Sequence, residues 1–132
     1  MRLFDDNSLA TAVIWQEARG EIREGKIAVG EVIRRRTKLK YSSDGTIAGT
    51  IFRPWQFSGM NTEDRNRIAA FKLDYDDPVV RDCAEAWVES EWTDHAKGGV
   101  LYHATWLKPP PYWVRKSLEV ARIGHHIFYV EL

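Results

Sequence analysis

Residues 12–36, AVIWQEARGEIREGKIAVGEVIRRR, determine how the first part of this chain folds. Ala10, Val13 and Ile14 follow the i, i+3, i+4 spacing of a buried helical face, and the i+7 position of that series is Glu17. Polar residues before this series and a glycine after it predict a helix that ends close to Glu17. A carboxylate therefore occupies a position at which the core of the helix should continue.

The second half of the same stretch predicts another helix, from about Glu24 to Lys38. Its apolar residues recur on one stripe, so the two helices should pack together. Arg36 is the next residue of that stripe, and a cation that faces inward needs a carboxylate partner. We expect that partner to be Glu21, just beyond the end of the first helix.

Gly, Pro, Ser and Asn punctuate residues 41–61, which predict an ordered loop with one helical turn. A short capped helix is expected over residues 61–73. A stronger helix begins at Pro78 with Asp77 as its N-cap. Its inward-facing residues should be Val80, Ala84, Trp87 and Val88.

The composition changes after Gly98 and Gly99. Three short runs rich in β-branched and aromatic residues, at 100–106, 117–123 and 125–132, predict a small antiparallel sheet. No repeat or linker divides the chain, so residues 1–132 are expected to form one domain of the α+β class, mainly helical with a C-terminal sheet.

Composition excludes several function classes. With 19 basic and 19 acidic side chains, the chain offers no electrostatic argument for a nucleic acid partner. Its one cysteine, Cys83, lies in an apolar pattern typical of a small buried hydrophobe rather than a nucleophile. The first residues lack the apolar core of a signal peptide, and no later stretch approaches a membrane span. We therefore expect synthesis in the cytoplasm and no integral membrane segment.

Glu17 has two interpretations. A glutamate near a helix C-terminus is usually solvated or paired with a neighbouring arginine, here Arg19 or Arg23. Its position on the apolar stripe favours partial burial, which raises a carboxyl pKa, as the negative end of the helix dipole also does. A glutamate that stays protonated near neutral pH is a general acid.

The order of motifs in this chain resembles the SleB-type cell wall hydrolases, a family of spore cortex-lytic enzymes and related phage lysins. The similar segments are Glu17-Ala-Arg-Gly-Glu21, EGKIAVGEVIRRR, Gln56-Phe57-Ser58, a proline-rich segment ending in Trp113, and IGHHIFYV. The resemblance runs from about Ala10 to Tyr129. It implies a lysozyme-like fold, cleavage of peptidoglycan glycan strands, and Glu17 as the catalytic acid. Arg35 departs from the pattern, which usually has Asn there.

A glycosidase of the ordinary type needs two carboxylates, and the aspartates of this chain all lie in turn or cap contexts. The resemblance implies another mechanism. Lytic transglycosylases use one glutamate as acid and then as base, while the substrate's N-acetyl group stabilises C1 and the muramoyl 6-hydroxyl closes an anhydro ring. We expect this reaction, rather than hydrolysis, at the MurNAc–GlcNAc β-1,4 bond, without a cofactor.

Sugar recognition requires apolar ring faces with hydrogen-bond donors at their edges. Ser58, Tyr102 and Trp113 are the predicted substrate-binding residues. Trp55, Trp106 and Tyr112 are further rings that could line a groove. Four residues are expected to support the site: Glu21, Arg36, Gln56 and His126. The last of these should be a buried hydrogen-bonding residue that ties the final strand to the groove.

Two other functions remain open. Histidines at 95, 103, 125 and 126 raise the possibility of a zinc-dependent N-acetylmuramoyl-L-alanine amidase. No HExxH motif appears, and adjacent His125 and His126 should point to opposite faces of a strand, so we expect no metal site. The second alternative is a non-catalytic glycan-binding module, which an exposed or salt-bridged Glu17 would favour. We expect a monomeric enzyme acting on bacterial peptidoglycan as a holin-released phage endolysin or a virion lysin, rather than a spore enzyme.

Overall fold

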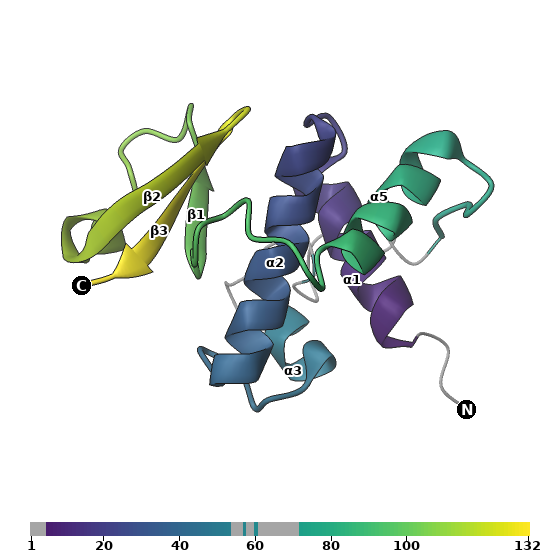
Figure 1. The fold of residues 1–132 in the computed structure, drawn as a ribbon, viewed down its shortest axis with the longest axis horizontal. Coiled ribbons are helices and arrows are strands. Elements are labelled where there is room, and N and C mark those ends of the chain that lie inside the picture. The colour runs from purple at the N-terminus through teal and green to yellow at the C-terminus, as the bar shows by residue number, and fades with distance from the viewer. Residues whose placement is uncertain (1–4, 54–56, 58–59, 61–71) are drawn as a thin grey trace.

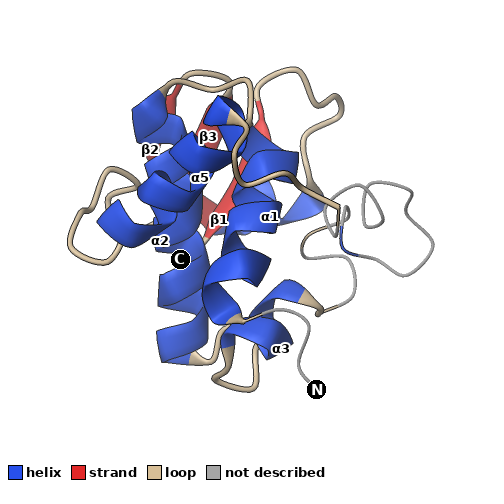
Figure 2. Ribbon diagram, turned by 90° about the vertical axis from the view of Figure 1, so that its right-hand side faces the viewer, coloured by secondary structure: helices blue, strands red, loops and turns tan. Residues whose placement is uncertain are grey.

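The computed structural model describes residues 5–53, 57, 60 and 72–132. Within this part of the chain, a group of helices lies beside a small sheet (Figure 1). The elements are α1 (Asp6–Ala18), α2 (Arg23–Leu39), α3 (Ile47–Ile51), α5 (Pro78–Glu89), β1 (Leu101–Ala104), the 3-10 helix η2 (Tyr112–Lys116), β2 (Ser117–Ile123) and β3 (His126–Glu131). Figure 2 looks from the helical side and shows the strands behind the helices, so the predicted α+β class is confirmed.

The first two helices agree with the predicted bounds to within one turn. α1 begins after Asp5, whose side chain accepts a hydrogen bond of 2.8 Å from the backbone N–H of Ser8. α2 is followed by Lys40, whose φ of 54° lies in the left-handed region that commonly ends a helix.

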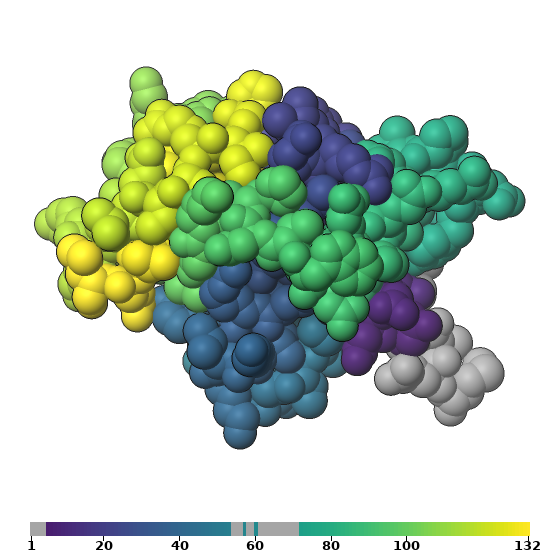
Figure 3. All heavy atoms as spheres, viewed as in Figure 1, coloured from purple at the N-terminus to yellow at the C-terminus, as the bar shows by residue number. Residues whose placement is uncertain are grey.

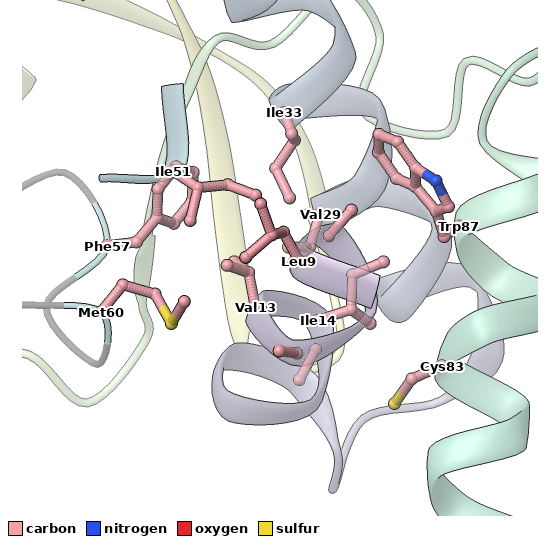
Figure 4. Close-up of a cluster of buried hydrophobic side chains, with 13 residues drawn as sticks. Leu9, Val13, Ile14, Val29, Ile33, Ile51, Phe57, Met60, Cys83 and Trp87 are labelled. Carbon is pink, nitrogen blue, oxygen red and sulfur yellow. The ribbon is translucent and has the colours of Figure 1, made fainter. Parts of the chain in front are cut away.

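A hydrophobic cluster joins α1, α2, α3 and α5 (Figure 4). Its labelled members are Leu9, Val13, Ile14, Val29, Ile33, Ile51, Phe57, Met60, Cys83 and Trp87. The predicted stripe of α1 is confirmed, because Ala10, Val13 and Ile14 are fully buried. Cys83 is also buried, and burial raises the pKa of its thiol to about 11, as expected of a core residue rather than a nucleophile.

α5 confirms the predicted cap but not every inward residue. The Asp77 side chain accepts hydrogen bonds from the backbone N–H groups of Val79 and Val80. Val88 was predicted to face inward, and this prediction is wrong, because Val88 is 54% exposed. The buried stripe runs through Trp87, and a step of about 100° per residue turns the next side chain toward solvent.

The three C-terminal runs form the predicted antiparallel sheet, with strand order β1-β3-β2. β1 is therefore an edge strand, and Tyr102 in β1 pairs with Phe128 in β3. One face of the sheet packs on α2, where Phe128 contacts a cluster with Ala28 and Val32. The other face is covered by partly buried Tyr41, Trp113 and Val114.

The segment between α5 and β1 crosses α2 (Figures 1 and 3). Buried Glu31 of α2 accepts hydrogen bonds from the Thr93 hydroxyl and from the backbone N–H groups of His95 and Ala96. Arg35 donates to the carbonyl oxygen of Gly99 at 2.7 Å. These contacts satisfy buried backbone groups and determine where β1, and with it Tyr102, begins.

α3 is the helical turn predicted within residues 41–61, and the Thr46 hydroxyl caps it by accepting from the Gly49 N–H. The helix predicted at 61–73 falls almost entirely outside the described residues. Among the helices that the structure describes, none has both the length and the apolar character needed to cross a membrane.

Candidate active site

A cleft of about 800 Å³ lies where the helices meet the edge of the sheet. Gln16 and Glu17 at the end of α1 form one part of its wall, and Arg36 near the end of α2 forms another. Residues 101–104, which make up β1, line it along the sheet edge. Trp106, before η2, and Tyr112, the first residue of η2, contribute exposed rings. A cleft of this size lies in the range of ligand-binding sites and can hold a segment of a polymeric substrate.

Glu17 projects into this cleft from the last turn of α1 and is partly buried. Its Oε1 accepts a hydrogen bond of 2.5 Å from the hydroxyl of Tyr102. Burial raises the pKa of the Glu17 carboxyl group, and the hydrogen bond from Tyr102 and the charge of Arg36 only partly oppose that effect. Glu17 is therefore poised to carry a proton at higher pH than an ordinary glutamate.

The ring of Tyr102 packs against two rings of the neighbouring strand β3. Its ring lies 5.1 Å from the ring of His126 in an edge-to-face arrangement and 5.6 Å from that of Phe128. Burial raises the pKa of Tyr102 well above its ordinary value, and the neighbouring Glu17 adds to this. Tyr102 was predicted to bind substrate; it lines the cleft, and its hydroxyl contacts the candidate acid.

Arg36 is buried, and its Nε donates to the carbonyl oxygen of Val100 at 2.6 Å. The guanidinium carbon also lies 5.1 Å from the centre of the Phe57 ring. Burial lowers the pKa of Arg36, while the charges of Tyr102, Tyr41 and Glu17 oppose this. Glu17 is thus the carboxylate whose charge raises the pKa of Arg36.

The predicted pairing of Arg36 with Glu21 is wrong, because Glu21 turns away to the hairpin between β2 and β3. Its Oε1 accepts from the backbone N–H of His125 at 2.7 Å, and its Oε2 lies 2.9 Å from the His125 ring Nδ1. Partial burial alone would raise the pKa of Glu21, but the bonds to His125 and the charges of both histidines lower it. Gly124 permits this contact, since a Cβ there would lie 2.6 Å from Glu21 Oε1.

His126 is buried and lines the cleft beside Tyr102, as predicted. Its Nδ1 lies 3.9 Å from Glu21 Oε1, too far for a hydrogen bond, and this nitrogen has no hydrogen-bond partner among the described residues. The predicted hydrogen-bonding role is therefore not seen at Nδ1. Burial lowers the pKa of His126, although Glu21 opposes this. His125 is exposed and lies in the turn before β3, and its ring Nδ1 is 2.9 Å from the carboxylate of Glu21 that His126 also approaches. The prediction that the two histidines point to opposite faces of a strand is therefore wrong.

The predicted aromatic wall is present where the structure describes it. Trp113 lines the cleft and packs edge-to-face on Tyr129 at 5.3 Å. Trp106 and Tyr112 also line it and are 66% and 74% exposed, so their faces are available to a ligand. The predicted residues Ser58 and Gln56, and Trp55, lie outside the described residues. No group of three or more His, Cys, Asp or Glu that could hold a metal ion occurs in the described part of the chain.

Residues 20–129 match the protein family described as Cell Wall Hydrolase. The chain belongs to this family. Among curated proteins, it is 29% identical over 124 residues to the spore cortex-lytic enzyme of Oceanobacillus iheyensis. That alignment covers 94% of this chain and 41% of the relative, so the chain spans about two-fifths of the relative's length.

Two solved structures share the fold of this cell wall hydrolase. The catalytic domain of the germination-specific lytic transglycosylase SleB from Bacillus anthracis superposes with a TM-score of 0.75 at 22% identity, covering 95% of this chain and 93% of that one. The catalytic domain of the Bacillus cereus SleB protein gives 0.77 at 23% identity, covering 95% and 89%. The predicted SleB-type family and lysozyme-like fold are confirmed.

The family match begins at Gly20, just after Glu17. The role of Glu17 in this cell wall hydrolase therefore rests on the apolar stripe that carries it and on its contacts in the cleft. It remains a prediction that no comparison tests.

Sequence reasoning missed several residues of the cleft wall, among them Tyr41, His103 and Glu131. The Tyr41 hydroxyl donates to Glu131 Oε1 at 2.6 Å, across 90 positions of sequence. His103 Nε2 lies 2.9 Å from the Tyr129 hydroxyl. Strand alternation could have placed Glu131 on the same face as Tyr129, but no local signal associates either residue with Tyr41.

Proposed function

We propose that this cell wall hydrolase cleaves the glycan strands of peptidoglycan at the MurNAc–GlcNAc β-1,4 bond by lytic transglycosylation. The observation that carries the proposal is a partly buried glutamate with a raised pKa, hydrogen-bonded to a tyrosine, in a cleft lined by exposed rings. The name of the Bacillus anthracis SleB relative, a lytic transglycosylase, supports the same reaction here.

In the first step, protonated Glu17 donates its proton to the oxygen of the glycosidic bond, and the bond between that oxygen and C1 breaks. The leaving strand departs with a new hydroxyl group. The substrate's own N-acetyl group stabilises the positive charge that develops at C1, so this step requires no second protein carboxylate.

In the second step, the muramoyl 6-hydroxyl attacks C1 and closes the anhydro ring, and Glu17, now a carboxylate, accepts the proton of that hydroxyl. The hydrogen bond from Tyr102 and the positive charge of Arg36 favour the carboxylate form between the two steps. Burial favours the protonated form before the reaction. These opposed influences allow one residue to act as acid and then as base.

The alternatives receive less support from the site. A glycan-binding module would be favoured by an exposed or salt-bridged Glu17, but Glu17 is partly buried and its hydrogen-bond partner among the described residues is a tyrosine hydroxyl. The cleft offers acid–base chemistry and sugar-stacking rings, which suit glycan cleavage better than amide cleavage.

Mass spectrometry of the fragments released from purified sacculi tests the proposal. Anhydromuramoyl ends are the expected product, whereas reducing ends would indicate hydrolysis. New free amino groups without cleaved glycan would overturn the proposal in favour of an amidase.

The matched variants are Glu17→Gln and Glu24→Gln, the latter an exposed glutamate in the first turn of α2. Glu17→Gln should keep the fold and the affinity for glycan but lose turnover, because an amide cannot donate the required proton. Glu24→Gln should retain activity. Near wild-type lysis by folded Glu17→Gln would exclude Glu17 as the acid.

Use of the enzyme as a phage endolysin or virion lysin, acting as a monomer, stays a prediction. Cleavage rates of one enzyme preparation on vegetative sacculi and on spore cortex distinguish a phage lysin from a cortex-specific enzyme. A marked preference for cortex would contradict the phage assignment.

A further inference from the structure

One end of the cleft carries an exposed carboxylate beside two phenol rings. Glu131, at the end of β3, is exposed, and its Oε1 accepts the hydrogen bond of 2.6 Å from Tyr41. Tyr112 lines the same cleft and is 74% exposed. Burial and the hydrogen bond to Glu131 raise the pKa of Tyr41 to about 12, and Tyr112 is close enough to add to the effect.

The proposed reaction gives Glu131 no role. Among the charged side chains of the described cleft wall, Glu17 is partly buried and holds a proton more readily than usual, and Arg36 is buried with its Nε on Val100. Glu131, by contrast, is a charged residue of this wall that is exposed to solvent. In the described part of the chain, its side-chain contact is with a neutral phenol rather than with a cation.

An exposed carboxylate next to aromatic rings is a favourable environment for an ammonium group. The carboxylate attracts the positive charge directly, and the negative face of each ring adds a cation–π attraction. Tyr41 also holds the carboxylate in one orientation, which reduces the entropy lost on binding.

We propose that Tyr41, Tyr112 and Glu131 form a subsite that binds a primary ammonium group of the substrate. This inference rests on the proposed function, because it places a glycan strand in the cleft. Peptidoglycan offers such a group in two places: an amino sugar that lacks its N-acetyl group, and the side-chain amine of a diamino acid in the stem peptide. Both have the same chemistry for this subsite.

The experiment compares kcat/KM on sacculi with free amines and on the same sacculi after acetylation with acetic anhydride. The wild-type protein should cleave the amine-bearing material about threefold to tenfold more efficiently, mainly through KM, which is the range expected of a partly exposed ion pair against aromatic rings. Glu131→Gln should reduce this ratio to about one. The control Glu119→Gln, which removes an exposed carboxylate that pairs with Arg122 on β2, should keep the wild-type ratio.

Two further substrates identify the source of the amine: peptide-free glycan in which only the GlcNAc sugars are deacetylated, so that MurNAc keeps the N-acetyl group that the reaction uses, and fully N-acetylated glycan that carries free diamino acid side chains. A ratio above one for either, relative to its acetylated counterpart, assigns the source. A ratio of one for both, or a ratio that persists in Glu131→Gln, would overturn the subsite alone. Failure of the wild-type protein to cleave any of these glycans would instead overturn the proposed function.

Discussion

Replacing Tyr102 with phenylalanine removes a single oxygen atom from the candidate site. The hydroxyl of Tyr102 donates to Glu17 at 2.5 Å, and when Glu17 is ionised such a bond is charge-assisted. The ring contacts of Tyr102 with His126 and Phe128 do not involve that hydroxyl. The variant therefore tests the hydrogen bond with little change in packing.

The size of the effect follows from the strength of that bond. A hydrogen bond to a charged group contributes about 1.5–3 kcal/mol, and one pKa unit corresponds to about 1.4 kcal/mol. The bond favours the ionised form of Glu17 and so lowers its pKa. Its loss should raise the pKa of Glu17 by about 1–2 units.

The assay is the pH dependence of kcat/KM, which reports the ionisation of the free enzyme. Wild-type activity should decline as pH rises through the pKa of Glu17, because the acid must be protonated. In Tyr102→Phe this decline should move to higher pH by about 1–2 units. Activity at the optimum should fall, because the carboxylate that acts as base has lost its donor.

Tyr75→Phe is the control, since Tyr75 is exposed and lies outside the cleft wall. It should leave the profile unchanged. If the decline of kcat/KM at high pH occurs at the same pH in Tyr102→Phe as in the wild type, or at lower pH, the assignment of Glu17 as the acid that accepts a hydrogen bond from Tyr102 is refuted.

Three further predictions concern stability. Arg36→Met should lower the free energy of unfolding by about 1–3 kcal/mol in denaturant titrations, because the carbonyl of Val100 loses a buried donor; an unchanged midpoint would show that this bond contributes nothing. Glu21 has a lowered pKa, so its contribution is present above its ordinary value of 4.5 and is lost as pH falls through its folded pKa. Glu21→Gln should therefore melt below wild type at pH 7, and the two melting temperatures should converge in acid; a constant difference would contradict the link to His125. Glu17 has a raised pKa, so Glu17→Gln should match wild type below pH 4.5 and become the more stable protein as pH rises above it; lower stability at pH 7 would contradict burial of the charge.

The elements of the fold were readable in the sequence because each depends on local spacing. The stripe through Val13 predicted the inner face of α1, and strand composition predicted β2 and β3. Glu17 could be selected for the same reason, since a carboxylate on an apolar stripe is visible within one helix. Val88 shows the limit of this reasoning. It is apolar and follows buried Trp87 but is exposed, because the packing of the helix decides which residues at the edge of an apolar stripe are buried.

Partners across the molecule were decided by the tertiary structure alone. The sequence predicted correctly that Arg36 points inward but assigned it to Glu21, whereas the docking of the α5–β1 segment on α2 brings Val100 to it. Glu21 instead accepts a hydrogen bond from the backbone N–H of His125 in the β2–β3 hairpin. The spacing of residues in the sequence does not indicate such a contact. Tyr41 and Glu131 meet only because the last strand passes the end of α2. Periodicity shows which side of an element a residue occupies, but a hydrogen bond depends on distances of about 3 Å between elements, and those distances exist only after helices and sheet have packed together.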